Sequence, residues 1–149
     1  MDRRILPVGK QNFEEIRQND MIYVDKTQYV WELAETSLTY FLSRPRRFGK
    51  SLFTSTLECY FRGKKDLFKG LYIYDKENAR GENAWTEYPV ITFYLSSGEF
   101  NDPSGLQDML NNVLENVIRE YDLTGEYAIS GETLSVRFRN VIMNLKEKT

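Results

Sequence analysis

The chain has 149 residues, 20 basic and 22 acidic side chains, 41% hydrophobic and 14% aromatic residues, one cysteine and no histidine. This composition excludes a disordered chain, supports one core in one domain, and gives no global charge that would attract nucleic acid or an anionic membrane. Without His, and with Cys59 alone, neither a zinc site nor a triad hydrolase is expected. The single thiol, with no membrane-length apolar run and no secretory signal, indicates a cytoplasmic protein.

The first part of the chain predicts a small helical segment. Residues 12–18 (NFEEIRQ) have the pattern of a short helix that begins at its first residue, and residues 21–24 (MIYV) that of a short extended piece. Residues 26–34 repeat apolar side chains at helical spacing, and either Asp25 or Thr27 is expected to cap this helix.

The next residues predict a strand, a loop and a helix. Residues 38–43 (LTYFLS) are apolar on both faces, which is typical of a strand buried in a parallel sheet, and Pro45 prevents its continuation. From Lys50 to Phe61 apolar residues recur at helical intervals until Gly63 stops them.

The middle of the chain predicts two further strands. Residues 71–74 (LYIY) have the composition of a short strand, and residues 75–83 that of a polar connection. Residues 89–96 (PVITFYLS) form the second convincing strand of the sequence.

The remainder predicts two amphipathic helices. Residues 97–103 form a turn cluster whose last residue, a proline, suits a first helical turn, and apolar residues then recur at helical spacing over 106–121. A loop over 125–131 precedes a last helix over 134–145.

Strands that alternate with helices indicate an α/β fold. We expect a three-layer α/β domain with a parallel sheet, preceded by the small helical segment. Only two strands are strong, and the sequence stops on a helix that would ordinarily lead into another strand. Residues 1–149 are therefore expected to be the N-terminal part of a larger domain, with an incomplete sheet whose exposed edge favours self-association.

One motif carries recognisable chemistry. Gly49, Lys50 and Ser51 match the end of the pattern G-x-x-x-x-G-K-[ST], at the point where the expected strand gives way to a helix. Gly49 permits close backbone approach to phosphates, and the helix start presents unpaired N–H groups and its positive dipole end. Lys50 adds a mobile cation, and the Ser51 hydroxyl is a Mg²⁺ ligand in this pattern. The sequence therefore predicts a Walker A-type loop that binds ATP or another nucleoside triphosphate together with Mg²⁺.

The loop departs from the pattern at its first glycine, which is replaced by Arg44. Arginines can compensate because their forked donors bind phosphate oxygens bidentately. The predicted nucleotide-binding residues are Arg46, Arg47, Phe48, Gly49, Lys50, Ser51 and Leu52, with Ser51 also as the metal ligand.

Other interpretations of this loop stay open. Residues 44–47 (RPRR) are also compatible with a solvated basic turn, or with a domain that grips nucleic-acid phosphates or a protein partner without nucleotide hydrolysis. In a further alternative the fold is kept but the loop stays empty, because parts outside this sequence are needed for affinity.

Hydrolysis needs a carboxylate beside the Mg²⁺ shell. The strand expected at 89–96 contains no acid, and Glu99 and Asp102 lie past its end, where surface or capping roles are the stronger interpretation. Whether the chain is an enzyme stays open, and by itself it is expected to be a poor ATPase.

Three long stretches of the sequence share motifs with one known family. They are LPVGKQNFEEIRQNDMIYVDKT (6–27), YFLSRPRRFGKSLFTSTLECYFRGKKDLFKGLYI (40–73) and YPVITFYLS (88–96), and the most specific part is YVDKT followed by FLSRPRRFGKSL. These stretches resemble the AAA-ATPase-like domain proteins of bacteria and archaea, whose C-terminal part is a PD-(D/E)XK nuclease-superfamily domain. The resemblance implies a P-loop NTPase in which RPRRFGKS is the normal loop, and it extends the phosphate role to Arg46, Arg47, Gly49, Lys50 and Ser51.

The resemblance also implies what this sequence does not carry. In the family, the acids linked to Mg²⁺ follow a helix similar to 134–145, in a DEYD-like motif that lies beyond Thr149, and the nuclease-like domain lies beyond it too. A nucleic-acid partner would thus come through the longer protein. Family members often carry an acid near the position of Tyr94, so no metal role is assigned to that strand. Proximity of Asp25 and Lys26 to the nucleotide is an alternative to the capping role that rests on the resemblance alone.

Overall fold

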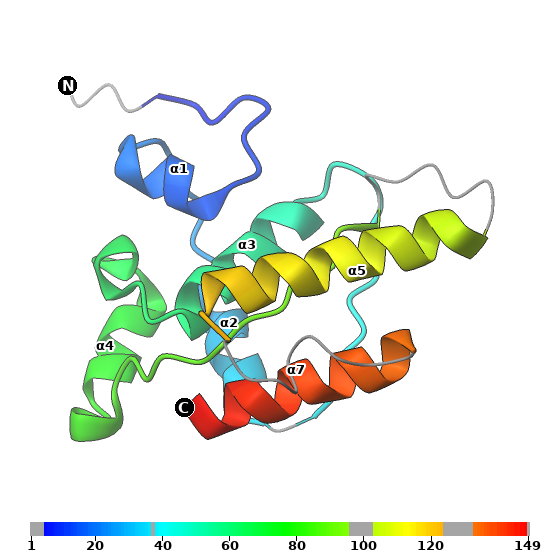
Figure 1. The fold of residues 1–149 in the computed structure, drawn as a ribbon. Helices are drawn as coiled ribbons and strands as arrows, with labels where there is room; N and C mark the ends of the chain where they lie inside the picture. Colours follow the sequence, from blue (N-terminus) through cyan, green and yellow to red (C-terminus); the bar gives the residue numbers. More distant parts are fainter. Residues whose placement is uncertain (1–4, 37, 96–102, 124–132, 149) are drawn as a thin grey trace. The chain divides into compact units, whose positions relative to one another are not determined.

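The computed structural model describes residues 5–36, 38–95, 103–123 and 133–148. The chain divides into two compact units, Met1–Tyr88 and Pro89–Thr149. The turn expected at 97–102, with Glu99 and Asp102, and the loop expected at 125–131 lie outside the described residues. The helices of the first unit are α1 (Phe13–Gln18), α2 (Thr27–Ala34), α3 (Lys50–Phe61) and α4 (Tyr72–Asn78), with short 3-10 turns η1 (Lys65–Phe68) and η2 (Gly81–Asn83); the second unit contains α5 (Pro103–Glu120) and α7 (Leu134–Lys148) (Figure 1).

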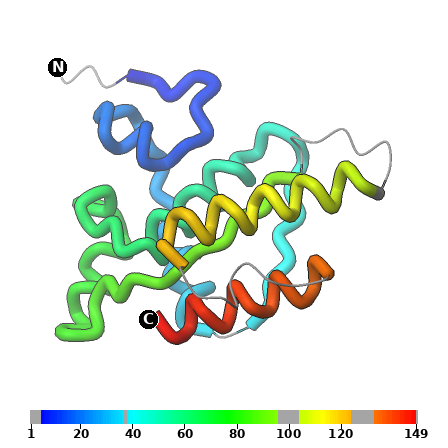
Figure 2. Tube along the Cα trace, in the orientation of Figure 1, coloured from blue at the N-terminus to red at the C-terminus, as the bar shows by residue number. Residues whose placement is uncertain are grey.

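The described residues contain helices but no β-strand, so the predicted α/β fold with a parallel sheet is wrong for this part of the protein. Residues 38–44 run as an irregular connection between α2 and α3 (Figure 2), and Phe41 is 93% exposed where a buried strand was expected. A strand is stable only when a neighbouring strand pairs with its backbone. The described ranges offer no such neighbour, so the β-propensity of LTYFLS is not realised, and the expected sheet edge for self-association is absent from them.

The other two predicted strands are also wrong. Residues 71–74 enter α4, which continues through the first part of the expected polar connection to Asn78. Residues 89–94 have no regular structure, and Ile91 packs against the core of the second unit. The Val90 N–H donates to the Tyr121 hydroxyl at 2.9 Å, so a side chain supplies a partner that a strand would have taken from its neighbour.

The predicted helices are confirmed, with local signals at their ends. α1 begins after Asn12, whose Oδ1 accepts a hydrogen bond from Glu15 N at 3.0 Å. α3 ends at the predicted Gly63, which has a φ of +65°. The Gly63 N–H donates to Tyr60 O at 3.0 Å and the Lys64 N–H to Cys59 O at 3.1 Å, so the last carbonyls of α3 are satisfied by a Schellman motif.

Asp25 and Thr27 join the N-termini of α2 and α4. Asp25 Oδ1 accepts from the N–H and the hydroxyl of Thr27, at 2.8 and 2.7 Å, and thereby satisfies the first N–H of α2. The N-cap residue itself is Lys26, not the predicted Asp25 or Thr27, and its side chain makes no capping bond. Its Oδ2 accepts from Tyr72 N at 2.7 Å, and Thr27 Oγ1 accepts from Ile73 N at 3.1 Å. The second pair of bonds starts α4, and residues 72–74 are helical for this reason.

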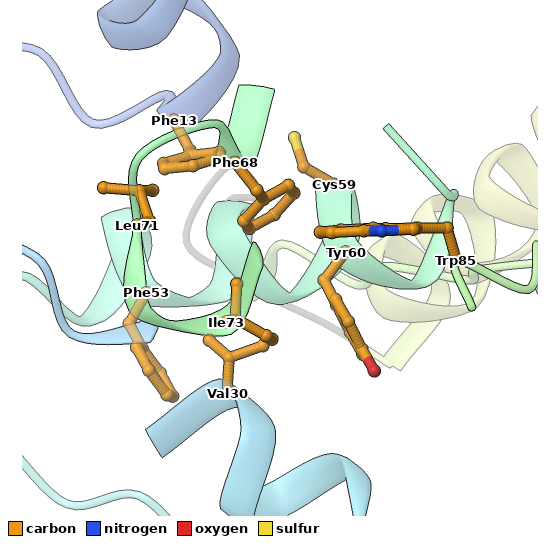
Figure 3. Packing of buried hydrophobic residues seen from close by; sticks show 9 residues of the cluster. All are labelled: Phe13, Val30, Phe53, Cys59, Tyr60, Phe68, Leu71, Ile73 and Trp85. Carbon is orange, nitrogen blue, oxygen red and sulfur yellow. The ribbon is translucent and has the colours of Figure 1, made fainter. Parts of the chain in front are cut away.

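An aromatic cluster forms the core of the first unit. The Phe68 ring centroid lies 4.9 Å from that of Phe13 and 5.3 Å from that of Trp85, and Val30 on α2 faces Ile73 in the same cluster (Figure 3). Rings at these separations add specific contacts to the burial of apolar area. The buried members are Phe13, Val30, Phe53, Cys59, Tyr60, Phe68, Leu71, Ile73 and Trp85.

One carboxylate is buried in this unit. Glu77 on α4 is 2% exposed, and it accepts from the Tyr60 hydroxyl at 2.8 Å and from Trp85 N at 3.0 Å. It also pairs with Arg80 Nε at 3.4 Å. Because a buried carboxylate is tolerated only when its lone pairs are satisfied, Glu77 fixes α4 and residue 85 against the C-terminal part of α3.

In the second unit α5 and α7 run in the same direction. Arg137 near the start of α7 donates to Asn111 Oδ1 at 3.0 Å, and Lys148 at its end donates to the carbonyls of Tyr121 and Asp122 at 2.6 Å. None of the helices in the described ranges is long and apolar enough to cross a membrane. The buried core residues of this unit are Leu114, Val117, Leu123, Val141 and Leu145.

Replacing Gly63 by Ala is expected to destabilise the first unit more than replacing Gly81. Both glycines have a φ of +65°, so both substitutions incur the left-handed penalty of about 1–2 kcal/mol. A Cβ at position 63 would lie 2.5 Å from Glu87 Cγ and 3.1 Å from Trp85 O, whereas nothing lies within 4 Å at position 81. Urea unfolding should show an additional loss of about 1 kcal/mol or more for Gly63→Ala. Equal losses for the two variants would contradict the close approach.

The first unit is expected to lose stability at alkaline pH. Burial raises the pKa of the Cys59 thiol from its ordinary value of 9.0 to about 11, and burial also raises the pKa of the Tyr23 and Tyr60 hydroxyls. Such groups contribute stability that is present below their unfolded-state pKa and is lost as the pH rises through the folded-state value. Urea unfolding should therefore show a falling free energy between about pH 9 and 11. Cys59→Ala should reduce this slope, and an unchanged slope would exclude the thiol as a cause.

Candidate functional site

A pocket of about 520 Å³ in the first unit joins the predicted loop to the segment before α1. One wall consists of Pro45, Arg46, Arg47 and the stretch from Gly49 to Leu52, and the other of Gly9, Lys10 and Gln11. The structure thus brings six of the seven predicted nucleotide-binding residues together. Phe48 does not line the pocket, and its side chain is 64% exposed.

The start of α3 is open to a ligand. Gly49 is its N-cap with a φ of +75°, and the first helical bond runs from Phe53 N to Gly49 O at 2.9 Å. The N–H groups of the three residues from Lys50 to Leu52 therefore have no partner within the helix. No side chain in the described part of the protein accepts from them, whereas side-chain oxygens accept from first-turn N–H groups of α1, α2 and α4. An uncapped start with its positive dipole end suits an anion.

A tight turn precedes this helix start. The Phe48 N–H donates to Pro45 O at 3.4 Å, and Arg47 within the turn has a φ of +68°. For any residue other than glycine, this left-handed backbone conformation costs about 1–3 kcal/mol. Residues with strained backbones of this kind concentrate at ligand sites. Arg44, which replaces the first glycine of the pattern, donates from Nη1 to Phe48 O at 3.4 Å across the turn. Arg44 thus supports the backbone of the loop.

The charges at the pocket have one sign. Lys10, Arg46, Arg47 and Lys50 line it, and its described lining residues include no Asp or Glu. Ser51 adds an exposed hydroxyl at the same place. The described residues hold no group of three or more His, Cys, Asp or Glu side chains that would bind a metal. A Mg²⁺ ion fits the Ser51 hydroxyl only if phosphates and water supply most of its oxygen ligands, which is its usual mode with nucleotides.

The second wall of the pocket is positioned by α1. The buried Phe13 N–H donates to Ser55 Oγ at 3.0 Å, and Lys64 pairs with Glu14 at 2.6 Å. Ser55 lies one helical turn after Ser51, so the residues just before Phe13 are held beside the start of α3. Sequence reasoning missed Gly9, Lys10 and Gln11 as site residues, although they lie in the stretch 6–27 that carries the family resemblance.

Asp25 and Lys26 do not line this pocket. Both carboxylate oxygens of Asp25 accept hydrogen bonds from the starts of α2 and α4. The structure therefore gives Asp25 and Thr27 of the YVDKT stretch a role in joining two helices, while Lys26 lines a second pocket with Gly49 and Leu52.

Comparison with known proteins identifies the family. A family described as "Predicted AAA-ATPase" matches residues 7–149. The chain belongs to the AAA-ATPase-like family. A protein of Azotobacter chroococcum mcd 1, described as "Uncharacterized protein in vnfD 5'region", is similar to this AAA-ATPase-like chain, with 40% identity over 116 residues, which cover 76% of the chain and 21% of the relative. The chain thus spans about a fifth of the length of that relative. No solved structure matches the chain.

Ser55→Ala is expected to loosen α1 from α3. The substitution leaves the buried Phe13 N–H without its acceptor, which costs about 1–3 kcal/mol. Thr54→Ala is the matched control, because the Thr54 hydroxyl bonds only to Lys50 O within the same helix, at 3.1 Å, and such bonds add little stability. Urea unfolding and limited proteolysis of residues 5–12 should both report a larger effect for Ser55→Ala. Equal behaviour of the two variants would show that α1 is held by its other contacts.

Proposed function

We propose that this chain binds the polyphosphate of a nucleoside triphosphate, together with Mg²⁺, at the start of α3. The observation that carries the proposal is an uncapped helix start beside a pocket lined by four cationic side chains. Membership of a family described as a predicted AAA-ATPase supports ATP as the ligand.

Each residue type has a defined task in this proposal. The N–H groups from Lys50 to Leu52 donate to phosphate oxygens, and Gly49 adds no side chain that would obstruct them. Lys50 neutralises phosphate charge as a point charge, while Arg46 and Arg47 donate bidentately. The Ser51 hydroxyl would hold Mg²⁺, which would neutralise phosphate charge when bound.

Binding without efficient turnover is the proposed behaviour of residues 1–149. Hydrolysis of a nucleotide requires a group that positions or activates water, and the described lining of the pocket supplies no carboxylate for this. We propose that ATP hydrolysis requires a water-activating group beyond the described residues that line this pocket.

Lys50→Ala should weaken the binding of Mg-ATP by about tenfold or more, because a charged hydrogen bond to phosphate is lost. Calorimetric titration of the parent and the variant measures this loss. Lys146→Ala is the control, since Lys146 is an exposed lysine of the second unit and should leave the affinity unchanged. Absence of binding by the folded parent would overturn the proposal.

A nucleic-acid interaction is the second candidate function. The exposed side chains of Arg46 and Arg47 favour it, because such arginines also bind the phosphates of a nucleic-acid backbone. Titration of a single-stranded oligonucleotide at two salt concentrations separates the two functions. Binding that falls steeply with salt and is unaffected by excess Mg-ATP would support this candidate over nucleotide binding.

A further inference from the structure

We propose that Lys10 is a further phosphate-binding residue of this pocket and that Glu15 competes with the nucleotide for it. The inference rests on the proposed nucleotide binding. Lys10 lines the pocket together with the loop residues although it lies more than 30 positions earlier in the sequence, and it forms an ion pair with Glu15 of α1. The side chains of the pair are 42% and 40% exposed.

The backbone of Lys10 is held in place while its side chain can exchange partners. The Lys10 N–H donates to Pro7 O at 3.1 Å in a turn that contains Gly9 at a φ of +72°. Ile22 N donates to Ile5 O at 2.9 Å and ties the same segment to the connection between α1 and α2. From this fixed point the long, flexible stem of a lysine reaches different acceptors at little cost.

Glu15 is fixed in the same way on the other side of the pair. Its N–H donates to Asn12 Oδ1 at 3.0 Å, and its carbonyl accepts from Asn19 Nδ2 at 2.8 Å. Loss of Lys10 therefore leaves the backbone of α1 unchanged. The carboxylate also lies in the first turn of α1, where the helix favours a negative charge without help from lysine.

The chemistry favours exchange when a polyphosphate is present. An exposed ion pair between Lys and Glu contributes little to stability. A phosphate group carries more charge, and its hydrogen bonds to an ammonium are among the strong ones. Lys10 should therefore leave Glu15 and complete a set of four cations from two segments of the chain. The nucleotide must then displace the Glu15 carboxylate from Lys10, so Glu15 lowers nucleotide affinity.

The test is a double-mutant cycle measured by calorimetric titration of Mg-ATP. Lys10→Ala should weaken binding on the order of tenfold, as expected for the loss of one charged contact. Glu15→Gln should tighten binding several-fold, because Lys10 is then released from its competitor. In Lys10→Ala/Glu15→Gln the effect of the second substitution should vanish, since no lysine remains to be released.

Several outcomes would overturn the inference. If Lys50→Ala abolishes binding and Lys10→Ala does not change it, the nucleotide site stands and the role of Lys10 fails. If Glu15→Gln tightens binding equally in the presence and the absence of Lys10, the effect comes from repulsion between the Glu15 carboxylate and the nucleotide and not from release of Lys10. If the folded parent does not bind Mg-ATP, the proposed function fails and the inference falls with it. Lys10→Gln keeps part of the aliphatic stem and a polar but uncharged end, and it replaces Lys10→Ala if that variant does not fold.

Discussion

The hydrogen bond from the Phe13 N–H to the Ser55 hydroxyl is the contact on which the candidate site depends. It joins the first residue of α1 to α3 one turn beyond the residue expected to ligate Mg²⁺. The Phe13 ring reinforces this hydrogen bond by packing in the core. Its centroid lies 5.0 Å from the ring centroid of Tyr23 and 4.9 Å from that of Phe68. Because the chain before Phe13 forms one wall of the pocket, the aromatic core and the ligand site share the same anchor.

The first unit uses side chains to satisfy helix starts, with one exception. Asn12 caps α1, Asp25 accepts from the first N–H of α2, and Asp25 together with Thr27 accepts from the first two N–H groups of α4. Only at the start of α3, among these four helices of the described residues, does no side-chain oxygen accept from a first-turn N–H group. The absence of such a bond at the start of α3 supports a ligand site there more strongly than the sequence pattern alone. Unsatisfied N–H groups at a helix start have a cost in stability that ligand binding can offset.

The sequence was informative where structure depends on neighbouring residues and misleading where it depends on distant ones. The span of α3, its end at Gly63 and the cap at Asn12 follow from local spacing and backbone preference, and all three are confirmed. The strands at 38–43 and 89–96 failed because a strand requires a partner that no local pattern guarantees. The start of α4 depends on Asp25, which lies 47 residues before Tyr72 in the chain. The segment with Lys10 is held at the pocket by the bond from Phe13 N to Ser55 Oγ, which joins residues 42 apart. The family, by contrast, was predictable because its motifs are continuous in sequence.

The cationic lining of the pocket has a consequence for how the protein responds to its solvent. Of the four cations, Lys10 is paired with Glu15, but Arg46, Arg47 and Lys50 repel one another, and at about 0.1 M salt the screening length of about 10 Å only partly relieves this repulsion. Any multivalent anion that prefers the folded chain relieves it further and stabilises the fold by mass action. Under the proposed function, sulfate and phosphate are expected to act as weak substitutes for the nucleotide, so that melting temperature and apparent nucleotide affinity both depend on the choice of buffer anion.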